Sequence, residues 1–147
     1  MNSIPSQHPI VRHRLVCQHV GLNVRDLKMV SRFYIHLLGF EKMRDYEVDA
    51  KIMADIFGVP LACQVRYLER NGFGIEFFFY KNGNLRPLEF ASTGYHHWTL
   101  LVEDKYAFCE ELKEKGVPVT QIAKSYGHTF FIKDPEGNLI EIKSYEA

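Results

Sequence analysis

Residues 19–40 read HVGLNVRDLKMVSRFYIHLLGF, and residues 97–117 read HWTLLVEDKYAFCEELKEKGV. Both stretches begin with the pattern H-x-x-L-x-V-x-D, continue for about three helical turns and close around a glycine, Gly39 or Gly116. Further along the chain, NGFGIEF (71–77) and EGNLIEI (136–142) share G-x-x-I-E followed by an apolar residue. Because the two motifs occur in the same order in each half, the sequence indicates an internal repeat.

The hydrophobic periodicity predicts the elements of each repeat. Apolar stripes at helical spacing predict helices that follow Asp26, the expected N-cap, and that cover 48–58 and 104–115. Alternating residues and turn signals predict strands over 15–24, 62–69, 73–80, 96–102, 127–133 and 138–144, with a short strand near 118–122. The expected fold class is α+β, with two paired β-α-β-β-β modules.

The two modules are expected to form one domain over residues 14–147, with module one at 14–82 and module two at 94–146. Residues 1–13, which have two prolines and no periodicity, are expected to be a mobile N-terminal tail. A module of about 60 to 70 residues buries too little surface to be stable alone. Pairing of two modules, within the chain or between chains, would let the uncovered faces of their sheets enclose a cavity.

The composition narrows the class of protein. A chain of 147 residues that is 46% hydrophobic suffices for one compact domain. Lys plus Arg and Asp plus Glu number 18 each, which leaves no basic stripe for nucleic acid or an acidic membrane surface. The three cysteines are far apart, and there is no signal-peptide or membrane-spanning run. We therefore expect a cytoplasmic protein that binds a small-molecule substrate, with no nucleic acid and no membrane as partner.

Strand alternation indicates which polar residues face the cavity. In the first strand the apolar set faces the helix, so His19 faces the cavity. In the second repeat His97 is the equivalent of His19, whereas His96 falls on the Trp98 side or at the start of the strand. The same alternation turns Glu76 and Glu141 away from the isoleucines that flank them.

Two imidazoles and two carboxylates on facing strands would form a metal site with two nitrogen and two oxygen ligands. A carboxylate inside GIEFFFY is costly to bury unless it is paired or bound to a metal. For any single residue, a position on a solvated sheet face is the ordinary alternative. Since the repeat supplies all four, we predict that one divalent ion (Zn, Ni, Co, Mn or Fe) binds to His19, Glu76, His97 and Glu141.

These stretches resemble the vicinal oxygen chelate superfamily, which includes glyoxalase I, methylmalonyl-CoA epimerase, extradiol dioxygenases, and fosfomycin- and bleomycin-resistance proteins. The matching segments are HVGLNVRDL…FYIHLLGF, the strand around Glu76, GYHHWTLLVED and FFIKDPEGNLIEI, over nearly all of 15–144. The resemblance implies paired β-α-β-β-β modules and metal ligands at the four positions named above. It also implies a site that some members build across a homodimer, and we expect a homodimer here.

Within that superfamily, two histidines with two glutamates are the ligand set of glyoxalase I. The expected function is a divalent-metal-dependent lyase or isomerase of that type, with metal-stabilised enediolate or enolate proton transfer on a small carbonyl or thioester substrate. Glu141 is expected to be ligand and catalytic base together, with Glu76 as its partner. Glyoxalase I tends to have Arg where this chain has Asn23, and E-L-T-x-N where it has EFFFY, so the use of glutathione stays open.

Two alternatives from other functional classes remain. An Fe(II) extradiol-type dioxygenase needs only two histidines and one glutamate, but it usually has Tyr where this chain has Phe131. A non-enzymatic, drug-resistance-type binding protein generally lacks the metal ligands. His128 and Cys17 could also lie near the cavity, although a surface histidine and an inert thiol are the ordinary interpretations.

Overall fold

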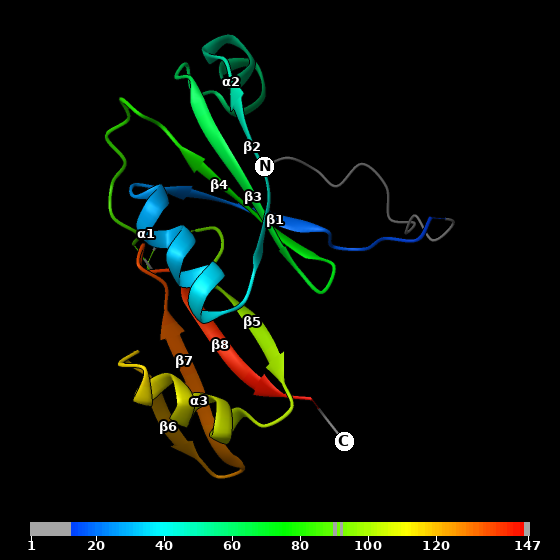
Figure 1. The fold of residues 1–147 in the computed structure, drawn as a ribbon, viewed down its shortest axis with the longest axis vertical. Helices are drawn as coiled ribbons and strands as arrows, with labels where there is room; N and C mark the ends of the chain where they lie inside the picture. The colour runs from blue at the N-terminus through cyan, green and yellow to red at the C-terminus, as the bar shows by residue number, and fades with distance from the viewer. Residues whose placement is uncertain (1–12, 90, 92, 146–147) are drawn as a thin grey trace.

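The computed structural model describes residues 13–89, 91 and 93–145. Its two four-stranded sheets, one from each half of the chain, lie one above the other in Figure 1, and helix α1 sits at the junction between them. The fold is α+β, and each half is a β-α-β-β-β module, as the repeat predicts. The predicted N-terminal tail lies outside the described residues except for His13.

Module one forms the sheet β1-β4-β3-β2, in which β1 runs parallel to β4 and the other neighbours are antiparallel. Two helices and one π-helical turn connect its strands. In chain order the elements are β1 (His19–Val24), α1 (Leu27–Arg32), η1 (Phe33–Leu37), β2 (Glu41–Val48), α2 (Ala50–Phe57), β3 (Cys63–Arg70) and β4 (Phe73–Phe79).

Module two repeats this topology as the sheet β5-β8-β7-β6, again with the first strand parallel to the last. Its elements are β5 (His97–Val102), α3 (Lys105–Glu114), β6 (Thr120–Lys124), β7 (Gly127–Lys133) and β8 (Leu139–Ser144). The aspartate of each repeat caps its helix as predicted. Asp26 accepts a hydrogen bond from the backbone nitrogen of Met29, and Asp104 accepts from those of Tyr106 and Ala107.

Strand β2 was not predicted from the sequence, and its irregular pairing explains why. The register between β2 and β3 shifts between Lys42 and Arg44, so Met43 is an extra residue with no partner on β3. The bulge breaks the alternation on which sequence reading depends. It also puts Lys42 on the helix-covered face, where it pairs with Asp45, and turns Arg44 to the uncovered face.

The core lies between the helix-covered faces of both modules. One buried cluster joins Tyr34 next to α1, Ile75 and Phe77 on β4, and Phe130 and Ile140 on the second sheet. Tyr34 is fully buried and stacks on Trp98 of module two, with ring centroids 5.9 Å apart. Because the covered faces share this core, the uncovered faces that carry the predicted ligands are left outside it.

The DPEG turn at residues 134–137 fastens the two modules together. Asp134, only 4% exposed, accepts a hydrogen bond of 2.8 Å from the phenol of Tyr34, and burial and this carboxylate raise the pKa of Tyr34 well above its usual value. Glu136 accepts from the backbone nitrogens of Arg25 and Asp26 and from the guanidinium of Arg25. The turn therefore fixes where the helix of module one sits on module two.

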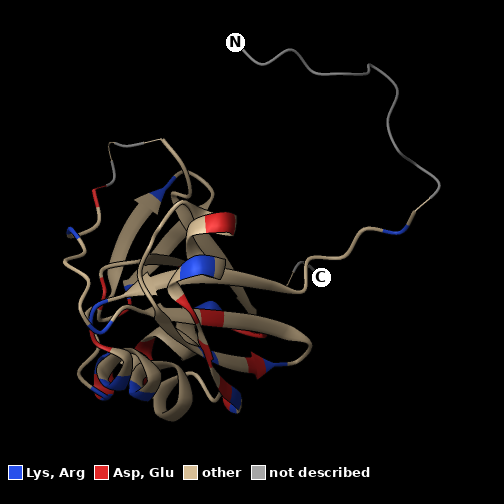
Figure 2. Cartoon of the chain, turned by 90° about the horizontal axis from the view of Figure 1, so that it is seen from above, with Lys and Arg blue, Asp and Glu red and all other residues tan. Residues whose placement is uncertain are grey.

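Positively and negatively charged residues are interspersed along the chain, as the coloured ribbon of Figure 2 shows. Exposed ion pairs such as Lys51–Asp55 and Lys113–Glu110 account for part of this pattern. No helix in the described ranges is long and apolar enough to cross a membrane.

Candidate metal-binding and active site

The strand register brings one histidine and one glutamate together on the uncovered face of each sheet. On module one, Glu76 lies opposite Gly21, two residues after His19, and the distance from His19 Nε2 to Glu76 Oε2 is 3.3 Å. On module two, Glu141 lies opposite Thr99, two residues after His97, and the distance from His97 Nε2 to Glu141 Oε2 is 3.4 Å. The predicted ligands therefore form two equivalent pairs.

The geometry of each pair fits a shared cation. Two donor atoms that each lie about 2.1 Å from a tetrahedral ion are about 3.4 Å apart, which is the separation seen in both pairs. The carboxylates are recessed and the imidazoles protrude, since the side chains of Glu76 and Glu141 are 12% and 14% exposed and those of His19 and His97 are 38% and 32% exposed. Each pair offers one nitrogen and one oxygen donor to the space above its sheet.

The residue before each histidine contacts the other ring nitrogen. Gln18 Oε1 lies 2.5 Å from His19 Nδ1, and because an amide oxygen only accepts, this contact is a hydrogen bond in the tautomer of His19 that has its proton on Nδ1. His96 Nδ1 lies 2.8 Å from His97 Nδ1, so one of the two rings donates to the other. A proton on Nδ1 leaves the lone pair on Nε2, the nitrogen that faces the glutamate, free to bind a metal.

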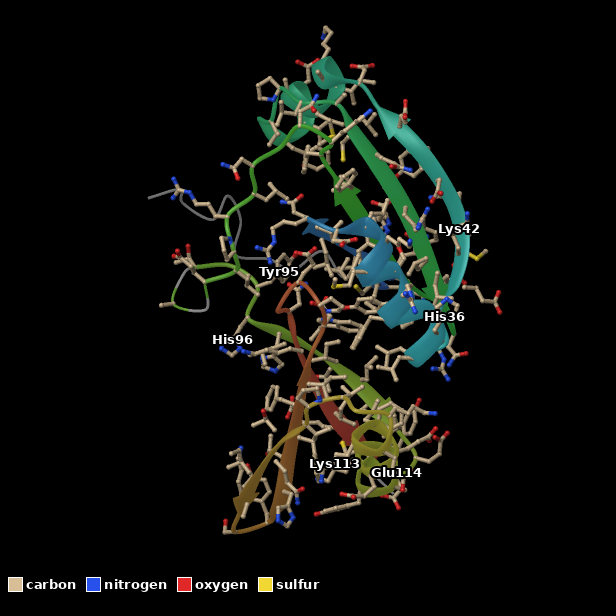
Figure 3. All side chains as sticks on the ribbon, turned by 60° about the vertical axis from the view of Figure 1, so that its left-hand side comes forward. His36, Lys42, Tyr95, His96, Lys113 and Glu114 are labelled. Carbon is tan, nitrogen blue, oxygen red and sulfur yellow. The ribbon has the colours of Figure 1, made fainter. Side chains whose placement is uncertain are left out.

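His96 lies directly before β5, where the loop that carries Tyr95 enters the strand (Figure 3), as the strand alternation allowed. Its ring meets that of His97 edge-on, with centroids 5.0 Å apart. The two adjacent histidines thus have different places. His97 pairs with Glu141, and His96 contacts the far side of the His97 ring.

The two glutamates have different neighbours, although the strands around them are equivalent. The phenol of Tyr46 donates a hydrogen bond of 2.7 Å to Glu76 Oε1. Burial, followed by this contact with Glu76, raises the pKa of Tyr46 to about 12, so the phenol stays protonated at neutral pH. Glu141 instead accepts from the Thr99 hydroxyl at 3.2 Å and lies 3.7 Å from the ammonium of Lys143. Glu76 is therefore held by a partly buried donor and Glu141 by a weaker, more exposed set.

The two pairs do not meet within one chain. Across residues 13–89, 91 and 93–145, no group of three or more His, Cys, Asp or Glu side chains gathers at one point. The chain therefore presents the four predicted ligands as two separate half-sites, each with two donors.

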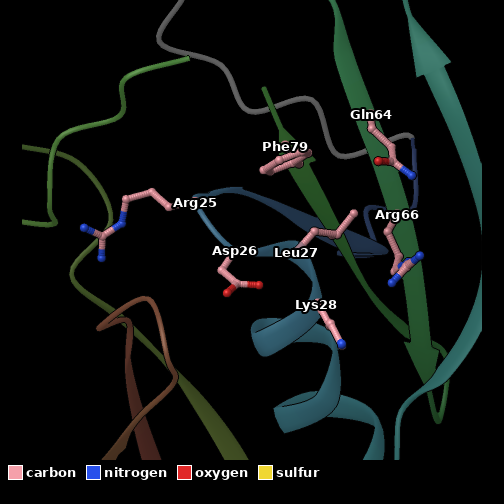
Figure 4. Close-up of a pocket in the computed structure, with 7 residues that line it drawn as sticks. All are labelled: Arg25, Asp26, Leu27, Lys28, Gln64, Arg66 and Phe79. Atoms are coloured by element: carbon pink, nitrogen blue, oxygen red, sulfur yellow. The ribbon is translucent and has the colours of Figure 1, made fainter. Parts of the chain in front are cut away.

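A hollow in the surface lies away from the two pairs. A hollow of about 560 Å³ opens at the start of α1 and is shown in Figure 4. Two of its cations are already engaged, since Arg25 pairs with Glu136 and Arg66 pairs with Asp45. None of the four predicted ligands lines it, so the hollow is not the candidate site.

The structure also locates the other candidate residues that the sequence suggested, His128 and Cys17. His128 lies on the α3 side of β7, where its ring meets Tyr106 and Phe130, and so it faces away from Glu141. Cys17 is exposed just before β1. Sequence reasoning missed Tyr46, because β2 was not predicted, and it assigned no role to Gln18, whose position before His19 repeats that of His96 before His97.

A family model described as the Glyoxalase/Bleomycin resistance protein/Dioxygenase superfamily matches residues 17–142. The chain belongs to this superfamily. The match includes all four residues of the two His–Glu pairs. It confirms the resemblance seen in the sequence motifs.

Individual relatives agree with the family assignment. The chain is 29% identical to a probable lactoylglutathione lyase of Vibrio cholerae over 88% of this chain and 89% of that protein. A glyoxalase family protein from Enterococcus faecalis has the same fold, with a TM-score of 0.69 and 22% identity over 86% of this chain and 95% of its own. An antibiotic binding protein from a Streptomyces species, TnmS3, superposes with a TM-score of 0.60 and 17% identity over 95% of this chain and 100% of its own.

Proposed function

We propose that the protein is a divalent-metal-dependent lyase or isomerase of the glyoxalase I type. The observation that carries this proposal is the pair of equivalent His–Glu contacts, each with Nε2 of the imidazole turned toward the carboxylate. A drug-binding relative would have no need of two such pairs. The similarity to a probable lactoylglutathione lyase supports the same assignment.

A complete site would form between two copies of the chain. One pair offers two donors, whereas ions of this kind take four or more ligands. In the proposed homodimer, His19 and Glu76 of one chain face His97 and Glu141 of the other. A two-fold axis would create this arrangement twice, because a symmetric interface repeats each contact. The uncovered sheet faces of the two chains would then enclose the cavity that the sequence led us to expect.

The side chains around the site have separate tasks in this proposal. A divalent ion bound there supplies Lewis acidity that polarises the substrate carbonyl. Glu141 would take the proton from the carbon that carries the hydroxyl, and the electron pair of that C–H bond would form a C=C bond and displace the carbonyl pair onto the carbonyl oxygen. Glu141 would then return the proton to the former carbonyl carbon, while the hydroxyl oxygen loses its proton and the carbonyl oxygen gains one, so the carbonyl and the hydroxyl exchange places. Glu76 stays in place as a ligand, because the phenol of Tyr46 donates a hydrogen bond to it. Glu141 has the greater freedom to move that a base needs.

The substrate class follows from this chemistry. It is a small carbonyl compound with a neighbouring oxygen, such as a 2-hydroxyacyl thioester. The thiol part remains open, since Asn23 stands where glyoxalase I tends to have an arginine, and in this structure its amide oxygen accepts a hydrogen bond from Tyr80.

Solvent exchange tests the reaction. The protein, loaded in turn with Zn, Ni, Co and Mn, is incubated in deuterium oxide with S-lactoylglutathione and with the lactoyl thioester of N-acetylcysteamine. Deuterium should enter at the carbon next to the thioester carbonyl, and Glu141→Gln should abolish the uptake. Glu103→Gln, which replaces an exposed glutamate, is the matched control and should not change it.

The dioxygenase alternative gives the opposite result in the same experiment. An extradiol enzyme consumes oxygen with catechols and leaves carbon-bound protons in place. Oxygen uptake with catechols by the Fe(II)-loaded protein, together with no exchange in any thioester, would overturn the proposal. On module two, Phe131 meets His97 edge-on at 5.4 Å and offers no hydroxyl at the position where dioxygenases usually have one.

A further inference from the structure

The two uncovered faces differ in chemistry, although they share one register. On module one, Arg44 lies opposite Tyr67, which in turn lies opposite Glu76. The corresponding row on module two consists of Thr120, Phe131 and Glu141. The repeat therefore keeps the glutamate and exchanges a cation and a phenol for a hydroxyl and a hydrocarbon ring. Such a difference points to a part of the substrate that only module one recognises.

The ring of Tyr67 lies between Arg44 and the His19–Glu76 pair. The guanidinium carbon of Arg44 lies 4.7 Å from the centre of the Tyr67 ring and 5.8 Å from that of Tyr46. The Tyr67 ring lies over Gly74, since a Cβ on that glycine would be 2.2 Å from Tyr67 Oη. It then meets His19 edge-on, with centroids 6.1 Å apart. Arg44 is thus one aromatic ring away from the half-site.

The guanidinium of Arg44 is available to a ligand. Within the described part of the chain, no carboxylate lies within ion-pair distance of Arg44, and its contacts are the two tyrosine faces. Two other arginines of the same module differ, because Arg25 pairs with Glu136 and Arg66 pairs with Asp45. An arginine held against aromatic rings keeps its N–H donors directed outward and loses little side-chain entropy when an anion arrives.

We propose that Arg44 binds a carboxylate of the substrate, at the end of the molecule opposite the carbonyl that reacts near His19 and Glu76. A planar guanidinium binds a planar carboxylate through two parallel hydrogen bonds, and this gives both affinity and orientation. The substrate class becomes a small carbonyl compound with a distal carboxylate. This inference rests on the proposed function, because it takes the His–Glu pairs as the place of the carbonyl.

Two probes test the inference directly. 2-Oxoadipate and 2-oxohexanoate share the oxo acid group that would lie at the His–Glu pairs, and they differ in that a distal carboxylate replaces a terminal methyl. Their affinities are measured by calorimetry on Co-loaded and on metal-free protein. The parent should bind 2-oxoadipate about tenfold or more tightly than 2-oxohexanoate. Arg44→Gln should remove this preference and leave the affinity for 2-oxohexanoate unchanged.

The control variant is Arg32→Gln, an exposed arginine on α1, which should retain the preference. Equal affinities of the parent for both probes, survival of the preference in Arg44→Gln, or no binding of either probe would overturn the inference. Metal uptake in the same samples separates the two proposals. Uptake without a carboxylate preference leaves the proposed function standing. A preference that depends on Arg44 in protein that takes up no metal leaves the Arg44 site standing and contradicts the proposed function.

Discussion

The phenol of Tyr46 donates a hydrogen bond of 2.7 Å to Glu76, and no tyrosine occupies the equivalent position beside Glu141. Ile122 stands there instead, opposite Thr129 of β7, as Tyr46 stands opposite Val65 of β3. The repeat therefore yields two His–Glu pairs with the same donor atoms and unequal carboxylates. This inequality suits a site in which one glutamate stays bound and the other moves a proton.

Replacing Tyr46 by Phe should weaken divalent metal binding by about 10- to 100-fold, as is usual when the partner of a metal ligand is lost. The ring would still fill its place on β2, so the fold should persist, and the affinity is measured by competition with a chelator. Tyr80→Phe is the matched control, since the Tyr80 phenol contacts Asn23 rather than a ligand. Equal metal affinity in Tyr46→Phe and the parent would show that Tyr46 does not support Glu76.

The residues before the two histidines should act alike. Gln18→Leu and His96→Ala each remove the partner of a ring Nδ1. Each variant should bind metal at the parent's stoichiometry, but its affinity for the metal should be lower than the parent's by about tenfold or more. His97→Ala should abolish stoichiometric binding, because it removes a donor atom. If His96→Ala lost the metal as completely as His97→Ala, the separation of the two roles would be wrong.

The link between Tyr34 and Asp134 should contribute to stability. Tyr34→Phe removes one of the four hydrogen bonds that the buried carboxylate accepts, the others coming from the backbone of Glu136 and from the backbone and side chain of Asn138. The expected loss in the free energy of unfolding at pH 7 is about 1.5–3 kcal/mol. Denaturant unfolding measures it. Tyr95→Phe, at a phenol that is 92% exposed, should lose almost nothing.

The same tyrosine predicts a pH dependence. Its pKa is raised in the folded state, so the folded protein holds the phenolic proton more tightly than the unfolded chain does. The resulting stabilisation is complete below the unfolded pKa of about 10 and is lost as the pH rises toward the folded pKa. Above pH 10, the parent should therefore lose stability more steeply than Tyr34→Phe. Parallel curves for the two proteins would show that Tyr34 does not titrate differently on folding.

The sequence predicted the parts of the fold and site that depend on local spacing. Strand alternation put His19 and His97 on the uncovered faces, and the repeat paired each with its glutamate, because β1 and β5 run beside β4 and β8 in the same register. It could not find Tyr46. The bulge at Met43 disrupts the alternation that would have revealed β2. The hydrogen bond from Tyr46 on β2 to Glu76 on β4 crosses the intervening strand β3, and the sequence pattern does not show the order of strands in the sheet.

The placement of the two modules also lay beyond the sequence. Alternation shows that each sheet has a covered and an uncovered face, but two uncovered faces could meet within one chain or between chains. The contacts of Tyr34 with Trp98 and with Asp134 decide this for the covered faces, which meet within the chain. Tyr34 is far from Trp98 and Asp134 in the sequence, so their stacking and hydrogen bond produce no local sequence pattern.

Complementation between two inactive variants tests the shared site most directly. One variant has His19→Ala with Glu76→Gln and the other His97→Ala with Glu141→Gln, and differently tagged copies are produced together so that mixed dimers can be isolated. Neither variant alone should bind metal, the parent dimer should bind about two ions, and the mixed dimer about one, because one of its two sites keeps all four ligands. A mixed dimer without metal, or metal retained by either variant alone, would contradict a site built from the first pair of one chain and the second pair of the other.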